Sequence, residues 1–113
     1  MSKPKRIVSP KTLDEVRNVL CMGCASLDPA AAREAAFDHG IRSHPHHLIS
    51  KGAGGPDIIQ NLLPVCVPHH QEIHRIGLAA MASKYGCIAH WLRLAGWEWD
   101  GSQGKWLPNF QTQ

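Results

Sequence analysis

The sequence predicts an α+β fold in a single domain covering residues 1–113. Three observations support it: helical apolar patterns lie towards both ends of the chain, two extended segments flank a Gly-rich stretch in the middle, and cysteines and histidines recur at metal-binding spacings. A chain of 113 residues can bury one modest core. A structural metal would add materially to its stability.

The first part of the chain is predicted to be mostly helical. Thr12 followed by Glu15 is a capping-box pattern, which predicts a helix from Thr12 with one apolar face formed by Leu13, Val16, Val19 and Leu20. Asp28 and Pro29 predict the N-cap and first position of a second helix that runs to Phe37. A short basic arm precedes both helices, at Lys3, Lys5 and Arg6. We expect it to be solvated, with a phosphate contact as the alternative.

The middle of the chain predicts a hairpin followed by a helix. Residues 46–49 and 58–65 are expected to be extended, and the Gly-rich residues 50–56 to turn between them. Pro68 marks the start of the next helix and Gly77 its end.

Two short helices, at 77–85 and 87–95, and a terminal hairpin from Trp97 to Leu107 complete the expected elements. We expect the tryptophans of this region to pack in the core or as a lid, with stacking on nucleic-acid bases as the alternative.

The cysteines predict a structural zinc site. No apolar run is long enough to span a bilayer and no apolar leader follows the N-terminus, so we expect a cytoplasmic protein with reduced thiols. In that setting a Cys3His set is predicted, pairing a knuckle at residues 21–24 with residues 66–69; its ligands are Cys21, Cys24, Cys66 and His69. Gly23 is expected to let the knuckle turn sharply. Cys87 is left over as a small buried apolar side chain, or as the substitute ligand should His69 not serve.

A second metal site is predicted from histidines. Six of the eight histidines lie between residues 44 and 74. Consecutive helical residues point about 100° apart, so His69 is separated from His70, whereas His70 and His74 share a face. Neighbouring strand residues point to opposite sides, so either His46 or His47 can bind a metal while the other stays free as a general base.

The stretch HHLISKGAGGPDIIQNLLPVCVPHH, together with His74, resembles the HNH endonucleases, or ββα-metal nucleases, in their small, phage-type, zinc-stabilised form. The paired His, the Gly-rich loop, the Asn and the final His cluster occur in order. The resemblance implies a ββα-metal core motif at 44–76, with His47 as general base and His46, His70 and His74 as ligands of one catalytic ion. It also implies that Asn61 orients the hairpin or ligates the ion.

One residue departs from the commonest family pattern. Many members have Asp where His46 stands, and imidazole in its place should shift preference from Mg²⁺ towards Mn²⁺, our first choice, or Ni²⁺, Co²⁺ or Zn²⁺. His44 matches no family position and is expected at the surface or behind the ligands. Asp57 is interpreted as a turn residue after Pro56. Lys51 and Arg75 are expected to contact DNA phosphates, with a solvated role as the alternative.

The predicted function is that of a metal-dependent DNA endonuclease that nicks one strand per event. The net charge of +3 permits a polyanionic partner without requiring one. No helix carries a dense row of base-reading side chains, so sequence preference should be weak. A monomer is expected, with a dimer or a larger assembly as the alternative. The alternative is a non-catalytic, zinc-stabilised module that binds DNA or a partner. Thiol redox chemistry at Cys21 and Cys24 is disfavoured because a thioredoxin-like βαβ context is missing.

Overall fold

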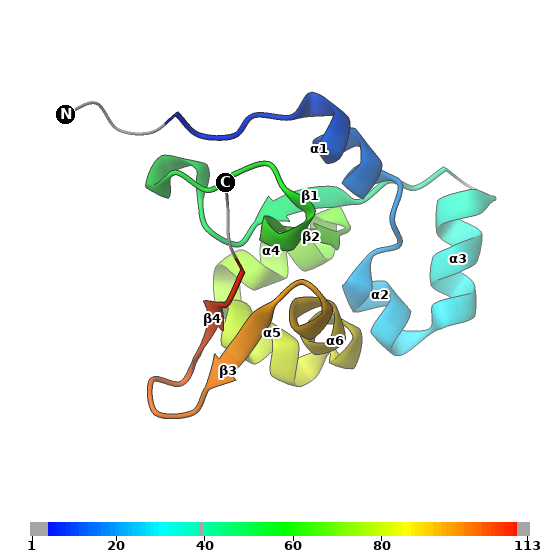
Figure 1. The fold of residues 1–113 in the computed structure, drawn as a ribbon. Coiled ribbons are helices and arrows are strands. Elements are labelled where there is room, and N and C mark those ends of the chain that lie inside the picture. The colour runs from blue at the N-terminus through cyan, green and yellow to red at the C-terminus, as the bar shows by residue number, and fades with distance from the viewer. Residues whose placement is uncertain (1–4, 39, 111–113) are drawn as a thin grey trace.

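The computed structural model describes residues 5–38 and 40–110, and it has an α+β architecture as the sequence predicted (Figure 1). The helices are α1 (Pro10–Arg17), α2 (Met22–Leu27), α3 (Pro29–Phe37), α4 (Val67–Ile76), α5 (Leu78–Lys84) and α6 (Gly86–Leu94). The strands are β1 (His44–His47), β2 (Leu62–Val65), β3 (Trp97–Asp100) and β4 (Lys105–Pro108). Short 3₁₀ helices occupy Lys51–Ala53 and Ile59–Asn61. Lys3, from the predicted basic arm, lies outside the described residues.

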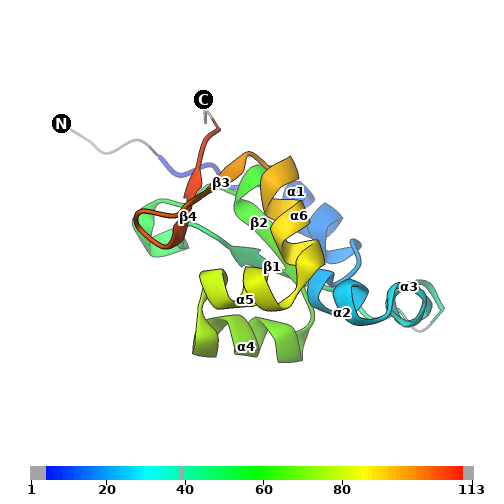
Figure 2. The same cartoon turned by 90° about the horizontal axis from the view of Figure 1, so that it is seen from below.

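The antiparallel β1–β2 hairpin lies in the middle of the molecule. His46 lies opposite Leu63 and His47 opposite Leu62, and every residue of β2 is buried. Helix α1 packs on one side of the hairpin, and helices α4, α5 and α6 lie on the other (Figures 1 and 2). This layering leaves β1 partly accessible while β2 runs through the interior, so side chains on β1 can serve a surface site on a rigid base.

The core fills the space between β2 and the C-terminal helices. Its fully buried members include Leu63, Val65, Met81, Ile88 and Leu92. The terminal hairpin is confirmed as β3–β4, and two of its tryptophans, Trp97 and Trp106, are buried as expected. Trp99 is half exposed. In the described part of the chain, no helix is long and apolar enough to cross a membrane.

Helix α1 begins earlier than the sequence predicted. Its N-cap is Ser9, whose hydroxyl accepts a hydrogen bond from the Thr12 N–H at 3.2 Å, and Pro10 takes the first helical position. The expected start at Thr12 was therefore wrong, because Ser9 with Pro10 is the stronger start signal. The helix also ends at Arg17, so Val19 lies beyond it.

The start of α3 is confirmed as predicted. The Asp28 side chain accepts a hydrogen bond from the Ala31 N–H at 3.1 Å, and Pro29 follows at the first position. Both signals are local in sequence, which is why they could be recognised without knowledge of the tertiary structure.

The central hairpin differs from the prediction in that its first strand lies two residues earlier and its second strand is shorter. Strand β1 covers residues 44–47 rather than 46–49, and the first part of the expected second strand includes a 3₁₀ helix that ends at Asn61. The cause is Asn61, whose side chain takes both backbone groups of Ile49, N–H at 2.7 Å and C=O at 3.1 Å. A side-chain amide thus replaces the strand pairing that would have extended the ladder.

Candidate functional site

The four residues of the predicted Cys3His set come together between α2 and α4. Cys21 and Cys66 are the N-caps of these helices, and Cys24 and His69 lie in their first turns. The Nδ1 atom of His69 lies 3.3, 3.5 and 3.2 Å from the Sγ atoms of Cys21, Cys24 and Cys66, respectively. Tetrahedral zinc with its usual bond lengths requires about 3.5 Å for such N–S separations. The group is close enough to bind one metal ion.

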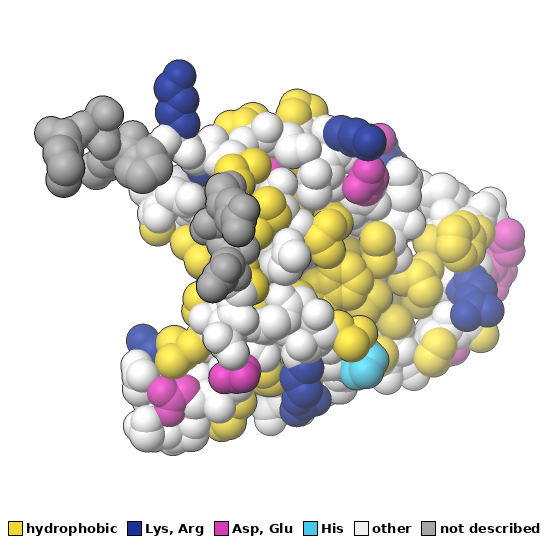
Figure 3. All heavy atoms as spheres, viewed as in Figure 1, with side chains coloured by type: hydrophobic (Ala, Val, Ile, Leu, Met, Phe, Trp, Pro, Cys, Tyr) yellow, Lys and Arg dark blue, Asp and Glu magenta, His cyan; other side chains and the backbone are white. Residues whose placement is uncertain are grey.

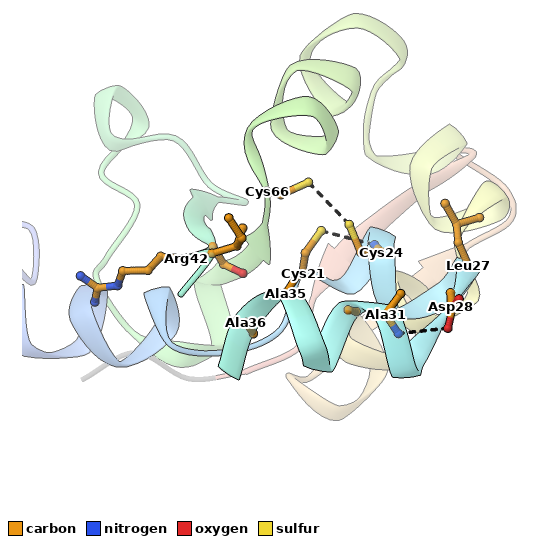
Figure 4. Close-up of a pocket in the computed structure, with 12 residues that line it drawn as sticks. Cys21, Cys24, Leu27, Asp28, Ala31, Ala35, Ala36, Arg42 and Cys66 are labelled. Carbon is orange, nitrogen blue, oxygen red and sulfur yellow. Dashed lines mark hydrogen bonds between the residues drawn. The ribbon is translucent and has the colours of Figure 1, made fainter. Parts of the chain in front are cut away.

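The sulfur atoms of this group point towards one another (Figure 4). Cys24 Sγ lies 3.7 Å from Cys66 Sγ, close to the roughly 3.8 Å expected between two sulfur ligands of one zinc ion. Burial, with the neighbouring Cys21 and Cys66 thiols, raises the pKa of Cys24 to about 12. Burial also raises the pKa of Cys66. Both side chains therefore favour the protonated thiol. A divalent cation at the centre of the group would favour the thiolate instead, because the metal binds the deprotonated sulfur.

Gly23 serves this site in a way the sequence analysis did not foresee. It lies inside α2, and the left-handed glycines among the described residues are at other positions, so no sharp turn is involved. A Cβ atom at Gly23 would instead lie 2.6 Å from Cγ and 2.7 Å from Nδ1 of His69. The absent side chain lets the imidazole approach the helix backbone closely.

Cys87 lies outside the Cys3His group. Its thiol is free and half-buried, and its backbone N–H donates to the Ser26 hydroxyl at 2.9 Å. His69 is the fourth member of the Cys3His group, so Cys87 is not needed as the substitute ligand. The His69 ring also packs edge-on against Tyr85, with 4.9 Å between ring centroids, and this contact helps to hold the ring in place.

Three further histidines meet beside an adjacent face of α4. His46 Nδ1 lies 3.1 Å from His70 Nε2, which in turn lies 3.2 Å from His74 Nε2. Metal–nitrogen bonds of about 2.1 Å place neighbouring nitrogen ligands about 3.0–3.4 Å apart, in octahedral and tetrahedral geometry respectively. The spacing of His70 and His74 on the helix and the projection of His46 from β1 therefore produce three ligand atoms that could share one ion.

Burial keeps two of these imidazoles, those of His46 and His70, in the form that binds metals. Burial, together with His70, His74 and His47, lowers the pKa of His46 to about 4. Burial likewise lowers the pKa of His70, with His74 and His44 adding to the effect. Both rings are thus neutral near pH 7 and carry free lone pairs, as metal ligation requires.

The three histidines line an open hollow of about 370 Å³. Its other lining residues are Leu13, Arg17, His44, Pro45, His47, Ser50 and Lys51. The ring of His44 lies 5.9 Å from that of His70, at the rim of the group. A hollow lined by both imidazoles and basic side chains suits an anionic group bound to a metal ion.

His47 faces the same hollow but is held by a different partner. Its Nε2 atom lies 2.7 Å from Oδ1 of Asp57, a side chain only 1% exposed. Burial alone would raise the pKa of Asp57, but hydrogen bonds from His47, the Ser9 N–H and Arg6, with the charge of Arg6, lower it to about 2. Interpreting Asp57 as a turn residue missed this contact, since only the fold brings residues 47 and 57 together.

Arg6 has a structural partner. Its guanidinium lies 2.7 Å from Asp57 Oδ1 and donates to the Gly55 carbonyl at 3.2 Å. The expectation of a solvated arm was therefore wrong for this residue, because the buried carboxylate of Asp57 attracts it. Lys5 remains exposed.

Asn61 is fully buried and its side chain is saturated by backbone groups. Besides Ile49 it donates to the Pro56 carbonyl at 3.1 Å. The side-chain oxygen and nitrogen of Asn61 are thus both used in hydrogen bonds that hold the connection between β1 and β2 together. Of the two roles expected for Asn61, this geometry favours the one that orients the hairpin.

The two predicted DNA-contact residues lie in different places. Lys51 lines the histidine hollow, whereas Arg75 is 71% exposed, lies 3.8 Å from the Glu72 carboxylate and borders a separate hollow beside His69. Arg17, which sequence analysis did not single out, lines the histidine hollow with Lys51. The face in Figure 3 carries scattered Lys and Arg side chains and a broad band of hydrophobic ones.

Comparisons of the chain with protein-family models, with curated proteins and with solved structures found no match. What the site can do is therefore inferred from the chemistry and geometry of its own residues.

Proposed function

We propose that this protein is a metal-dependent DNA endonuclease of the HNH type, in which the β1–β2 hairpin and α4 form the ββα-metal motif. One observation carries the proposal: His46, His70 and His74 present three nitrogen atoms to a common point in an open hollow that His47 also lines. Three ligands leave coordination positions for water and a phosphate, which a closed four-ligand site does not. The order of these residues along the chain matches the resemblance noted in the sequence.

In the proposed reaction His47 acts as general base. Its ring accepts a proton from a water molecule, the water oxygen attacks the scissile phosphorus, and the bond from phosphorus to the 3′ oxygen breaks. A divalent ion held by His46, His70 and His74 would supply charge neutralisation at the phosphate and at the departing oxygen. In this proposal Lys51 and Arg17, which line the hollow, bind the phosphates that flank the cut.

We assign a structural zinc ion to the Cys3His group. The set of three thiolates and one imidazole is typical of closed zinc sites, and the separations between its ligand atoms fit tetrahedral zinc. This ion would tie α2 to the start of α4. Zinc removal should therefore affect the fold first and the hollow as a consequence.

The set of three imidazoles also bears on the catalytic ion. Imidazole suits Mn²⁺, Co²⁺, Ni²⁺ and Zn²⁺ better than Mg²⁺, which prefers oxygen ligands. We propose Mn²⁺ as the preferred ion. One three-histidine group in the described part of the chain predicts nicking of one strand at a time, and recognition through phosphates predicts weak sequence preference.

A supercoiled-plasmid assay tests the function. Protein with zinc retained in the Cys3His group would be mixed with plasmid and with Mn²⁺, Mg²⁺, Ni²⁺, Co²⁺ or Zn²⁺ separately. We expect open circles to form before linear DNA, fastest with Mn²⁺. The variant His47→Ala should lose cleavage by at least about 10²-fold, the usual scale for a general base.

His90→Ala is the matched control, because His90 is an exposed histidine on α6 outside both ligand groups. It should cleave as the wild type does. Plasmid that stays intact with every ion, from folded and zinc-loaded protein, would reject the nuclease and leave the non-catalytic binding module.

A further inference from the structure

Asp57 lies in the loop between β1 and β2. Its carboxylate contacts both the N-terminal segment and His47. Oδ1 accepts from Arg6 Nη1 and lies the same 2.7 Å from His47 Nε2, and Oδ2 accepts from the Ser9 N–H at 2.9 Å. The Asp57 N–H donates to the Ile7 carbonyl at 2.9 Å. A buried acid with so many ordered partners holds its position well.

This contact decides which nitrogen of His47 carries the proton. An ionised carboxylate can only accept hydrogen bonds, so His47 Nε2 must be the donor. In the neutral imidazole the other nitrogen, Nδ1, then has the free lone pair. Among the described residues none hydrogen-bonds to Nδ1, and the ring lines the hollow that holds the three metal-type histidines.

We propose that Asp57 is a positioning residue for His47: it fixes the ring and its Nε2–H tautomer, so that Nδ1 is the atom that accepts the proton from water. The inference rests on the proposed nuclease function. It extends the site to residues 6–9, because Arg6 and Ser9 hold Asp57 in place. The N-terminal segment is then part of the machinery that orients the base.

The substitution Asp57→Asn tests the tautomer directly. Arg6 and the Ser9 N–H can only donate, so the new amide group can donate to neither of them. His47 is the partner of this side chain that can become a hydrogen-bond acceptor. If the new amide donates to Nε2, the ring proton must move to Nδ1. Two-dimensional ¹H–¹⁵N NMR of the imidazoles, on protein with one equivalent of Zn²⁺ at pH 7.5, should show Nε2–H in the wild type and Nδ1–H in the variant.

Kinetics gives the second measurement. Asp57→Asn should lower kcat for plasmid nicking by about 10²-fold or more while KM changes less than about twofold, because the base holds its proton on the wrong nitrogen. Arg6→Gln is the matched control for loss of the ion pair. It keeps the contact between Asp57 and His47, so it should retain Nε2–H and lose less than about tenfold in kcat.

The outcomes separate the two proposals. Nδ1–H in the wild type would overturn the positioning role, whatever the plasmid assay gives. Equal losses of kcat in Asp57→Asn and Arg6→Gln, with Nε2–H kept in both, would also overturn it and assign Asp57 to the fold alone. A wild type that carries Nε2–H but cuts no plasmid with any ion would overturn the proposed function, and the catalytic part of this inference with it.

Discussion

The Cys3His group and the three-histidine group lie on adjacent faces of α4, yet their surroundings differ. Cys21 belongs to the hydrophobic core, Cys24 and Cys66 are partly buried, and the three thiols border a hollow of about 240 Å³ that is lined mainly by apolar side chains of α2 and α3. The histidines instead border an open hollow of about 370 Å³, and His74 is exposed. A closed four-ligand group suits a structural ion, and an open three-ligand group suits an ion that must meet water and substrate. Under the proposed function, the same helix would serve stability on one face and chemistry on the other.

The largest expected effect is on folding. Cys24→Ser removes one ligand of the closed group and should cost more than about 4 kcal/mol of unfolding free energy, with loss of helical signal in far-UV circular dichroism. Cys87→Ser, which changes a half-buried thiol outside the group, should cost less than about 1 kcal/mol.

His70→Ala should behave in the opposite way to Cys24→Ser. It should keep the fold within about 1 kcal/mol and lose Mn²⁺-dependent nicking. If it unfolds the protein as Cys24→Ser does, the two groups do not differ in role.

The next effect concerns the packing of His69. Gly23→Ala would put a methyl group 2.6 Å from the His69 ring, so the ring or α2 must shift. We expect a loss of about 1–3 kcal/mol in urea unfolding, together with weaker zinc retention against a chelator. Gly86→Ala is the control, since nothing lies within 4 Å of the added methyl, and its stability should equal or exceed that of the wild type.

A smaller effect is expected from pH at the open group. The pKa of His46 is about 4 in the fold and 6.5 in an unfolded chain, so the unfolded chain takes up the extra proton at a higher pH. The stability contributed by neutral His46 is present above pH 6.5 and is lost as the pH falls towards 4. Between pH 7.5 and 5.5, zinc-loaded protein without a second metal should lose about 1 kcal/mol more than His46→Gln does. Urea titrations at several pH values measure this, and parallel curves for the two proteins would contradict it.

The smallest effect concerns DNA binding. Lys51→Ala should weaken binding of a labelled duplex several-fold at low salt and reduce the slope of log affinity against log salt by about 1. Arg75→Ala should have a smaller effect, because Arg75 lies near the Glu72 carboxylate and away from the histidine hollow. Fluorescence anisotropy without a catalytic ion measures both. A larger loss for Arg75→Ala would place the DNA on the other side of α4.

Backbone geometry explains how the histidines could be divided between two groups from the sequence, and the family resemblance then selected His46 rather than His47 for the second group. The separation of His69 from His70 follows from the helix repeat, and that of His46 from His47 follows from the alternation of a strand. Asp28 with Pro29 is likewise a local signal, confirmed at the start of α3. Features that depend on a few neighbouring residues could therefore be predicted from the sequence.

Features that depend on tertiary contacts could not be predicted from the sequence. Asp57 follows Pro56 and matches a turn residue in sequence, and its contacts with Arg6 and His47 exist only because the N-terminal segment crosses the loop between β1 and β2. Gly23 was expected to serve a turn, whereas the approach of the His69 ring is what requires it. A distant partner leaves no periodic pattern in the sequence around either residue.

The placement of His69 and His70 next to each other in α4 has a consequence for how the protein matures. If zinc is needed to dock the start of this helix, a newly made chain cannot assemble the open group before the closed one is filled. If the protein is the nuclease proposed above, the supply of zinc would then control when DNA cutting becomes possible. Chains made without zinc would accumulate as inactive precursors.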